Sequence, residues 1–278
     1  MWGSGSNDVY AVGQNGTIVH TSNQGASWES LQSGTQATLG GVWGTSAGNV
    51  YVAGYTVTLN PTTISGLVLH SIDGGGTWTP AVLTADDCLL TAIWGSAPND
   101  LYAVGGSYIF HGDGTGAWTN EYTAAGGASL ASVWGSSGSD IYVVGSNGAE
   151  LLVHGTGGGN WSTVAVPPGV PGGNGGLSGV WGLGASYVVG VGAGGYVMQG
   201  SGTSWSAMLT GTNLNAAWAS SPHDLFAIGD AGTIVHTSDG ITWTTEVPPV
   251  SNNLFGIWGS GPGDVYVVGD TGTILHGD

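Results

Sequence analysis

The chain has 278 residues, of which 17 are acidic and none is Lys or Arg, and its formal charge is −17 at pH 7. Nucleic-acid binding and adhesion to anionic membranes rest on basic side chains, so both are excluded in any ordinary form. The same absence excludes a P-loop, a Schiff-base lysine and an arginine clamp on a carboxylate or phosphate.

The sequence repeats itself with a period of about 40 residues, which matches the four strands of one propeller blade. The tripeptide Trp-Gly-Ser, or a near relative of it, marks the start of each copy, at Trp2, Trp43, Trp94, Trp134, Trp181, Trp218 and Trp258. The repeat therefore predicts a single domain over 1–278 that is built from seven copies of one unit.

Each copy predicts four strands in a fixed order. The first strand ends in Trp-Gly, as in 39–44, and the second runs from Asp to Gly, as in 100–105. The third ends in His, as in 66–70, and the fourth begins at a Trp such as Trp78. Runs of β-branched and aromatic residues between Asp and Gly are typical of strands. No stretch sustains a 3.6-residue apolar period, so the expected helix content is near zero.

The seventh copy has no sequence for a fourth strand. The chain stops at Asp278 after the third strand, and Met1 directly precedes the first repeat Trp, so we expect no signal peptide in this chain. The predicted fold is all-β: a seven-bladed β-propeller of four-stranded antiparallel blades, with blade 7 lacking its outer strand. Exposed strand edges pair with other chains, so a partner, a copy of the chain or further residues are expected to fill this edge.

The aromatic residues mostly belong to the repeat. All 13 Trp fall at first- or fourth-strand positions. Six of the 10 Tyr are assigned to one second-strand position, namely Tyr10, Tyr51, Tyr102, Tyr142, Tyr187 and Tyr266. Aromatic residues that recur in this way indicate packing between blades more than ligand contacts.

The histidines and most carboxylates also recur once per copy. Six His end the third strand, namely His20, His70, His111, His154, His236 and His276. Copies on successive blades are too far apart to share a zinc ion, whose ligand bonds are about 2 Å long, so structural roles are favoured and no metal is expected. An Asp stands six residues after most repeat Trp, where it would cap a turn, and Asn49 replaces it in the second copy.

The turn between the third and fourth strands carries a family resemblance. Residues 71–78 (SIDGGGTW) fit the Asp-box pattern at every position, and 21–28, 111–118 and 237–243 are degenerate copies. The chain resembles Asp-box (BNR-type) β-propellers, and among them the WGS-repeat propellers of secreted or surface bacterial proteins. The resemblance implies a propeller fold and structural turns at Asp73, Asp239, Asn23 and Asp113. Sialidases of this family hold their substrate with an arginine cluster, which this chain cannot provide.

Three insertions mark the expected binding surface. Residues 55–65, 80–91 and 164–177 interrupt the regular repeat, and the strand order puts all three on one face as irregular loops. The candidate binding residues on this face are Tyr55, Asn60, Asp86, Asp87, Tyr108 and Tyr122. The adjacent carboxylates Asp86 and Asp87 could bind calcium weakly, and no other cofactor is expected. The single cysteine, Cys88, is expected to be a buried or inert thiol, because no basic neighbour lowers its pKa.

These features favour a non-catalytic scaffold or protein-interaction propeller, secreted or at the cell surface and part of an extracellular assembly. One alternative is a lectin-like carbohydrate binder that uses the tyrosines of the insertion face. Another is a glycoside hydrolase in which Asp86 or Asp87 works with a second carboxylate. An exposed aromatic beside polar groups would favour the lectin, and two carboxylates facing across a cleft would favour the enzyme.

Overall fold

The computed structural model describes residues 1–59, 61–83, 85, 87–167, 175–202, 204–246 and 250–277. Their strands form seven antiparallel sheets, and the helical content is limited to three 3₁₀ turns. These turns are η1 (Ala193–Gly195), η2 (Asp230–Gly232) and η3 (Asp270–Gly272). None of the described helices is long and apolar enough to cross a membrane. The chain divides into two compact units, Met1–Val133 and Trp134–Asp278.

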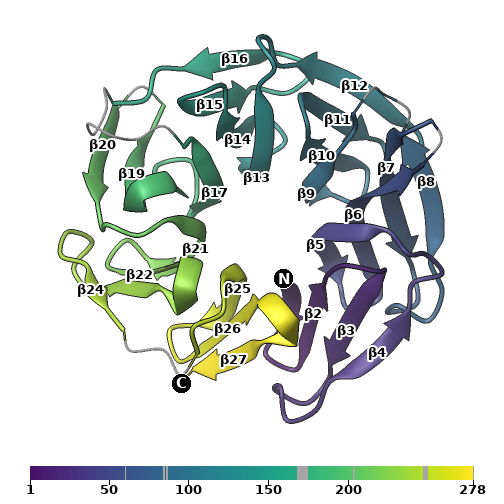
Figure 1. Ribbon diagram of the computed structural model, residues 1–278, viewed down its shortest axis with the longest axis horizontal. Coiled ribbons are helices and arrows are strands. Elements are labelled where there is room, and N and C mark those ends of the chain that lie inside the picture. Colours follow the sequence, from purple (N-terminus) through teal and green to yellow (C-terminus); the bar gives the residue numbers. More distant parts are fainter. Residues whose placement is uncertain are drawn as a thin grey trace. The chain divides into compact units, whose positions relative to one another are not determined.

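The first unit contains three four-stranded sheets, here called blades 1 to 3 (Figure 1). Blade 1 consists of β1 (Trp2–Gly5), β2 (Asp8–Val12), β3 (Thr17–Thr21) and β4 (Glu29–Gln32). Blade 2 consists of β5 (Thr38–Ser46), β6 (Asn49–Thr58), β7 (Thr63–Ser71) and β8 (Thr79–Leu83). Blade 3 consists of β9 (Leu90–Ala97), β10 (Asp100–Gly105), β11 (Tyr108–Gly112) and β12 (Trp118–Thr123).

The next four sheets, blades 4 to 7, begin at β13, which contains the boundary between the units. Blade 4 consists of β13 (Ser129–Ser137), β14 (Asp140–Ser146), β15 (Glu150–Gly155) and β16 (Trp161–Val164). Blade 5 consists of β17 (Leu177–Gly182), β18 (Val188–Gly192), β19 (Tyr196–Ser201) and β20 (Ser204–Leu209). Blade 6 consists of β21 (Leu214–Ser221), β22 (Asp224–Gly229), β23 (Ile234–Thr237) and β24 (Thr244–Thr245). Blade 7 has only β25 (Leu254–Gly261), β26 (Asp264–Gly269) and β27 (Ile274–Gly277).

The fold is therefore a seven-bladed β-propeller with a three-stranded seventh blade, as the sequence predicts. Its core consists of apolar clusters between neighbouring sheets. One cluster in the first unit joins blades 1 and 2, and another joins blades 2 and 3 around the fully buried Leu90 and Cys88. In the second unit, comparable clusters join blade 5 to blade 6 and blade 6 to blade 7. Apolar burial of this kind stabilises a chain that has no Lys–carboxylate or Arg–carboxylate pairs.

Three sequence-based assignments are wrong in whole or in part. Of the expected irregular loop 80–91, residues 80–83 belong to β8 and residues 90–91 belong to β9. Tyr187 does not share the second-strand position of the other five tyrosines, because Trp181 pairs with Val189 where Trp2 pairs with Tyr10. Tyr187 instead stands six residues after the repeat Trp, at the position of the repeated Asp. Residues 55–65 are also not an irregular loop. Most of them extend β6 and β7 into a long hairpin that pairs as far as Thr58 and Thr63.

Candidate functional site

A network of polar side chains lies at the turn between the first two strands of most blades. In blade 1, Ser4 Oγ donates a hydrogen bond to Asp8 Oδ2 at 2.6 Å, and His20 Nε2 lies 2.8 Å from Asp8 Oδ1. The ring of His20 stacks on Tyr10 with 4.3 Å between the ring centroids. The same Ser–Asp–His arrangement recurs at Asp100, Asp140, Asp224 and Asp264.

The order of the groups in this network gives it a structural role. The carboxylate lies between the serine and the histidine, whereas nucleophilic catalysis by serine requires the imidazole to contact the hydroxyl. Each histidine therefore joins the third strand to the start of the second strand. Among the residues that the structure describes, no three His, Cys, Asp or Glu side chains cluster as a metal would require.

Tyrosine hydroxyls of the same network connect neighbouring blades of the first unit. Tyr10 Oη donates to Ala47 O, and Tyr51 Oη donates to Pro98 O, each at 3.2 Å. Burial is the main cause that raises the pKa of both phenols, so both remain protonated donors. The repeated tyrosine thus couples the packing of one blade to the turn of the next.

Blade 2 differs from this pattern in charge. Its turn carries Asn49, whose Oδ1 lies 2.7 Å from His70 Nε2 and whose Nδ2 donates to Thr45 Oγ1 at 2.7 Å. An amide oxygen only accepts hydrogen bonds, so Nε2 of His70 carries the proton. Burial lowers the pKa of His70, which favours the neutral ring. The network of blade 2 is consequently uncharged, whereas the networks of blades 1, 3, 4, 6 and 7 hold a carboxylate.

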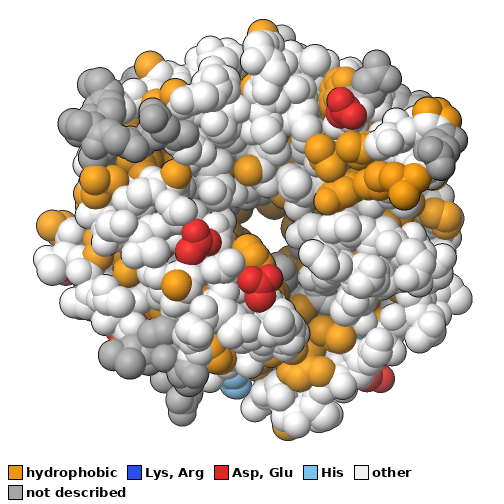
Figure 2. Space-filling model, in the orientation of Figure 1, with side chains coloured by type: hydrophobic (Ala, Val, Ile, Leu, Met, Phe, Trp, Pro, Cys, Tyr) orange, Lys and Arg blue, Asp and Glu red, His pale blue; other side chains and the backbone are white. Residues whose placement is uncertain are grey.

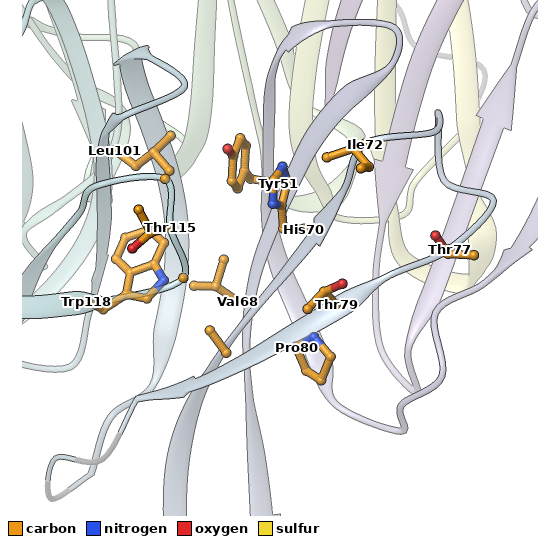
Figure 3. A pocket seen from close by; sticks show the side chains of 13 residues that line it. Tyr51, Val68, His70, Ile72, Thr77, Thr79, Pro80, Leu101, Thr115 and Trp118 are labelled. Carbon is orange, nitrogen blue, oxygen red and sulfur yellow. The ribbon is translucent and has the colours of Figure 1, made fainter.

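A crevice of about 540 Å³ opens between blades 2 and 3 beside this uncharged network. Figure 3 shows the indole of Trp118 and the hydroxyl of Thr115 on the blade 3 side, and Tyr51, His70 and Thr79 on the blade 2 side. No Asp or Glu is among the residues that line it. Its volume falls in the range of about 300–1,000 Å³ found for small-molecule sites, and its aromatic rings and hydroxyls suit an uncharged ligand.

One side chain that lines the crevice is smaller than its equivalent in blade 1. Ala81 on β8 pairs with Val68, as Leu31 on β4 pairs with Ile18 in blade 1. Leu31 packs against the cluster between blades 1 and 2, whereas Ala81 lines the crevice. The sequence reasoning missed this site because its residues occupy repeat positions assigned to packing. Asn49 and Ala81 are the signals that could have indicated it.

The described members of the predicted binding set lie on β6, on β11, on β12 and before β9. Tyr108 pairs with Thr123, and Tyr122 pairs with Ile109, so the two tyrosines point to opposite faces of blade 3. Tyr108 packs on the core cluster between blades 2 and 3. Tyr55 is half-buried on β6, and Asp87 is exposed with a φ of 53°. Asn60 and Asp86 lie outside the described residues.

The extended hairpin of blade 2 presents apolar side chains to solvent. Val57 and Leu59, near its tip, are 51% and 76% exposed. Figure 2 shows hydrophobic side chains gathered over this part of blade 2. Cys88, in the adjacent core, is fully buried, and burial raises the pKa of its thiol, which makes it a poor nucleophile.

The Asp-box carboxylates accept hydrogen bonds within their own turns. Asp73 accepts from Thr77 N at 2.9 Å and from Ser71 Oγ at 2.8 Å, and these bonds lower its pKa. Asp239 accepts from two backbone amides, which lower its pKa further. Asn23 accepts the equivalent bond from Ser27 N at 3.0 Å, whereas Asp113 accepts from Thr115 N, only two residues on, at 2.9 Å.

The outer edge of blade 7 differs from the outer edges of the other blades. In the part of the chain that the structure describes, β27 pairs with β26 alone. Leu275 is partly exposed, as is Val19 in blade 1, whereas its equivalents Leu69, Val153 and Val235 are buried. The side chain of His276 is 39% exposed, against 11% for His20 in blade 1. Among the described residues, no fourth strand covers these positions in blade 7.

Comparisons with known proteins identify the class of fold. No family model and no curated protein matches the chain. Among solved structures, YCF48 from Cyanidioschyzon merolae is 18% identical with a TM-score of 0.76, covering 100% of this chain and 94% of that chain. A structure of YCF48 bound to D1 peptide is 17% identical with a TM-score of 0.72, covering 98% and 90%. Virginiamycin B lyase from Staphylococcus aureus is 14% identical with a TM-score of 0.70, covering 98% and 94%.

At these identities the likeness shows the fold alone, and the Asp-box relationship remains a resemblance. The three neighbours also differ in kind, because one is described as bound to a peptide and another is named as a lyase. Function must therefore be argued from the residues of this chain.

Proposed function

We propose that this chain is a non-catalytic protein-interaction propeller, secreted or at the cell surface and part of an extracellular assembly. The observation that carries the proposal is the outer edge of β27 in blade 7, with which no other strand of the described residues pairs. A propeller of similar fold is described as bound to a peptide, which supports this kind of role. The repeated Ser–Asp–His groups are engaged in bonds that hold strands together, which supports a role without catalysis.

The hydrogen-bonding groups of β27 are arranged to accept another strand. Gly269 N donates to Thr273 O at 3.0 Å, which sets the alternation of the β26–β27 ladder. In an antiparallel pair, alternate residues turn their N–H and C=O groups away from the partner. Ile274 and His276 therefore direct these groups to the open edge, where an extended segment can pair with them.

Sedimentation velocity across a hundredfold range of protein concentration tests the edge. We expect the wild-type chain to self-associate through β27 at high concentration. Ile274→Pro should abolish the association, because proline lacks the outward N–H and is tolerated on edge strands. Ile274→Ala removes the same side chain, keeps the N–H, and should behave as the wild type. Equal association of the two variants, or a strict monomer at every concentration, would contradict the proposal.

Carbohydrate binding is a second candidate, favoured by the uncharged crevice with Trp118 and its hydroxyl groups. A glycan array tests it, and Ala81→Leu should abolish any signal by filling the crevice as Leu31 fills the equivalent space of blade 1. A strictly monomeric chain that binds one glycan would replace the scaffold proposal with a lectin. The glycoside-hydrolase alternative has less support, because no carboxylate lines the crevice.

A further inference from the structure

We propose that the partner segment that completes blade 7 is an extended strand that begins with a tryptophan and carries a glutamate within three residues of it. This inference rests on the proposed function, because it identifies the chemistry of the segment that binds the open edge. Two positions in blade 7 carry it, Gly277 and His276. In other blades, the equivalents of these positions contact the fourth strand.

The first position is the glycine that follows the blade histidine. In blade 3, a Cβ at Gly112 would lie 2.8 Å from the indole of Trp118. In blade 4, a Cβ at Gly155 would lie 2.5 Å from the indole of Trp161. The tryptophan of the fourth strand thus lies directly on this glycine. Gly277 occupies the same position in blade 7, yet no atom of the described residues lies within 4 Å of its Cβ position.

The second position is the blade histidine itself. Three blades place a glutamate from the outer strand, or directly after it, against Nδ1 of this ring, in the pairs His20–Glu29 at 3.1 Å, His111–Glu121 at 3.5 Å and His236–Glu246 at 3.9 Å. These glutamates follow the tryptophan by one or three residues. In blade 7, His276 Nε2 bonds Asp264 at 2.8 Å, and among the described residues no carboxylate lies within 4 Å of Nδ1.

The other residues of the segment are less constrained. Apart from the residues that make these contacts, the residues of β4 and β12 are mostly exposed or half-buried. Packing within the blade therefore restricts their identity little. The chain's own tryptophan strands are already paired in blades 1 to 6. A second copy of the chain could donate such a strand only by opening a blade of its own. Pairing of two copies through the backbone of β27 therefore leaves these two positions unfilled, and a segment other than the six paired strands is needed to fill them.

A synthetic peptide of residues 115–124 (TGAWTNEYTA), labelled with fluorescein and capped at both ends, serves as the probe. This sequence contains the fourth strand of blade 3, where a His-Gly pair also precedes the turn. Fluorescence anisotropy should show binding to the wild-type chain. The Trp118→Ala peptide should bind about 30-fold more weakly, as for an aromatic hot spot. The Glu121→Gln peptide should lose up to about fivefold, as for an exposed ion pair.

Gly277→Ala provides the matching change in the protein. Its new methyl group meets open space in the free chain but would collide with the indole of the bound strand, so affinity should fall by about tenfold. Gly263→Ala is the control, because that position, in a turn of the same blade, is also open. Circular dichroism and thermal melting should show the same fold for both variants.

The outcomes separate this inference from the proposed function. Equal binding of the wild-type and Trp118→Ala peptides, or equal affinity of Gly277→Ala and Gly263→Ala, would overturn the tryptophan assignment and leave the edge proposal standing. Failure of the peptide to bind, while Ile274→Pro still abolishes self-association, would overturn the inference alone. Equal sedimentation of Ile274→Pro and Ile274→Ala would overturn the edge proposal itself.

Discussion

Replacing Asn49 by Asp tests whether the neutral amide of blade 2 sets the charge of His70 and of the crevice beside it. His70 Nε2 lies 2.7 Å from Asn49 Oδ1, and burial lowers the pKa of the ring. A carboxylate at this position favours the protonated ring, and an opposite charge at such range moves a pKa by about 1–3 units. We expect the pKa of His70 to rise by this amount in Asn49→Asp.

The rise in the pKa of His70 changes the pH dependence of folding stability in a definite direction. In the wild type, the folded pKa of His70 lies below its unfolded value of 6.5, so stability falls as pH drops below 6.5. In Asn49→Asp, a raised folded pKa adds stability that is fully present below pH 6.5 and is lost as pH rises through the folded pKa. Because the ring is half-buried, solvent screening reduces the expected gain to about 1 kcal/mol.

NMR titration of the His70 Cε1–H resonance measures the pKa directly, and urea unfolding at acidic and alkaline pH measures the stability difference. Asn49→Ala is the control, since it removes the hydrogen bond without adding charge. A His70 pKa in Asn49→Asp that equals or falls below the wild-type value would refute the electrostatic reasoning. So would a stability gain of equal size on both sides of the titration.

Three further substitutions test the packing and the turns. Leu90→Ala, at a fully buried position, should cost about 2–5 kcal/mol in urea unfolding, whereas Val82→Ala, at a position 64% exposed, should stay within about 0.5 kcal/mol. Gly105→Ala should lower the melting temperature sharply, because its Cβ would lie 1.9 Å from Leu89 O, whereas Gly5→Ala meets open space and should leave it unchanged. Asp73→Asn should melt below the wild type at neutral pH, and the gap should close as pH falls below 3.8, where the wild-type carboxylate, whose pKa is lowered, becomes protonated. A gap that is constant down to pH 2 would contradict the role of that charge.

The strands and the number of blades could be predicted because each repeat contains local sequence signals for its own strands and turns. Asp and Gly bound the second strand, a His ends the third strand, and a Trp begins or precedes the fourth. These signals depend on neighbours in sequence, and seven copies reinforce one another. The three-stranded seventh blade followed from the same count.

Register was harder to predict where a blade departs from the repeat. In blade 5, Val189 takes the tyrosine position, and Gln199 takes the histidine position opposite it. Tyr187 Oη donates to Gln199 Oε1 at 3.0 Å, so the Tyr–Gln pair stands where other blades have Asp and His. Matching residues by type assigned Tyr187 to the second-strand position that Val189 occupies, two residues further along the chain. The pairing of β17 with β18 corrects this assignment.

The crevice could not be predicted from motifs because it depends on what fills the space between two sheets. Most of the residues that line it stand at repeat positions, and one of them is an alanine where blade 1 has a leucine. The facing of the candidate tyrosines also depends on the strand ladder. Tyr108 and Tyr122 are close in the ladder, but the alternation of side chains places them on opposite faces.

The absence of Lys and Arg connects the fold to the proposed mode of binding. The repeated carboxylates are used as hydrogen-bond acceptors for histidines, hydroxyls and backbone amides, as at Asp8 and Asp73. A surface without cations cannot recognise a partner through charged clamps on acidic groups. Recognition must then use strand edges, aromatic rings, hydroxyls and the ring nitrogens of histidines. Both the β27 edge and the crevice of blade 2 offer groups of these kinds, which is why each is a stronger candidate than any acidic cluster.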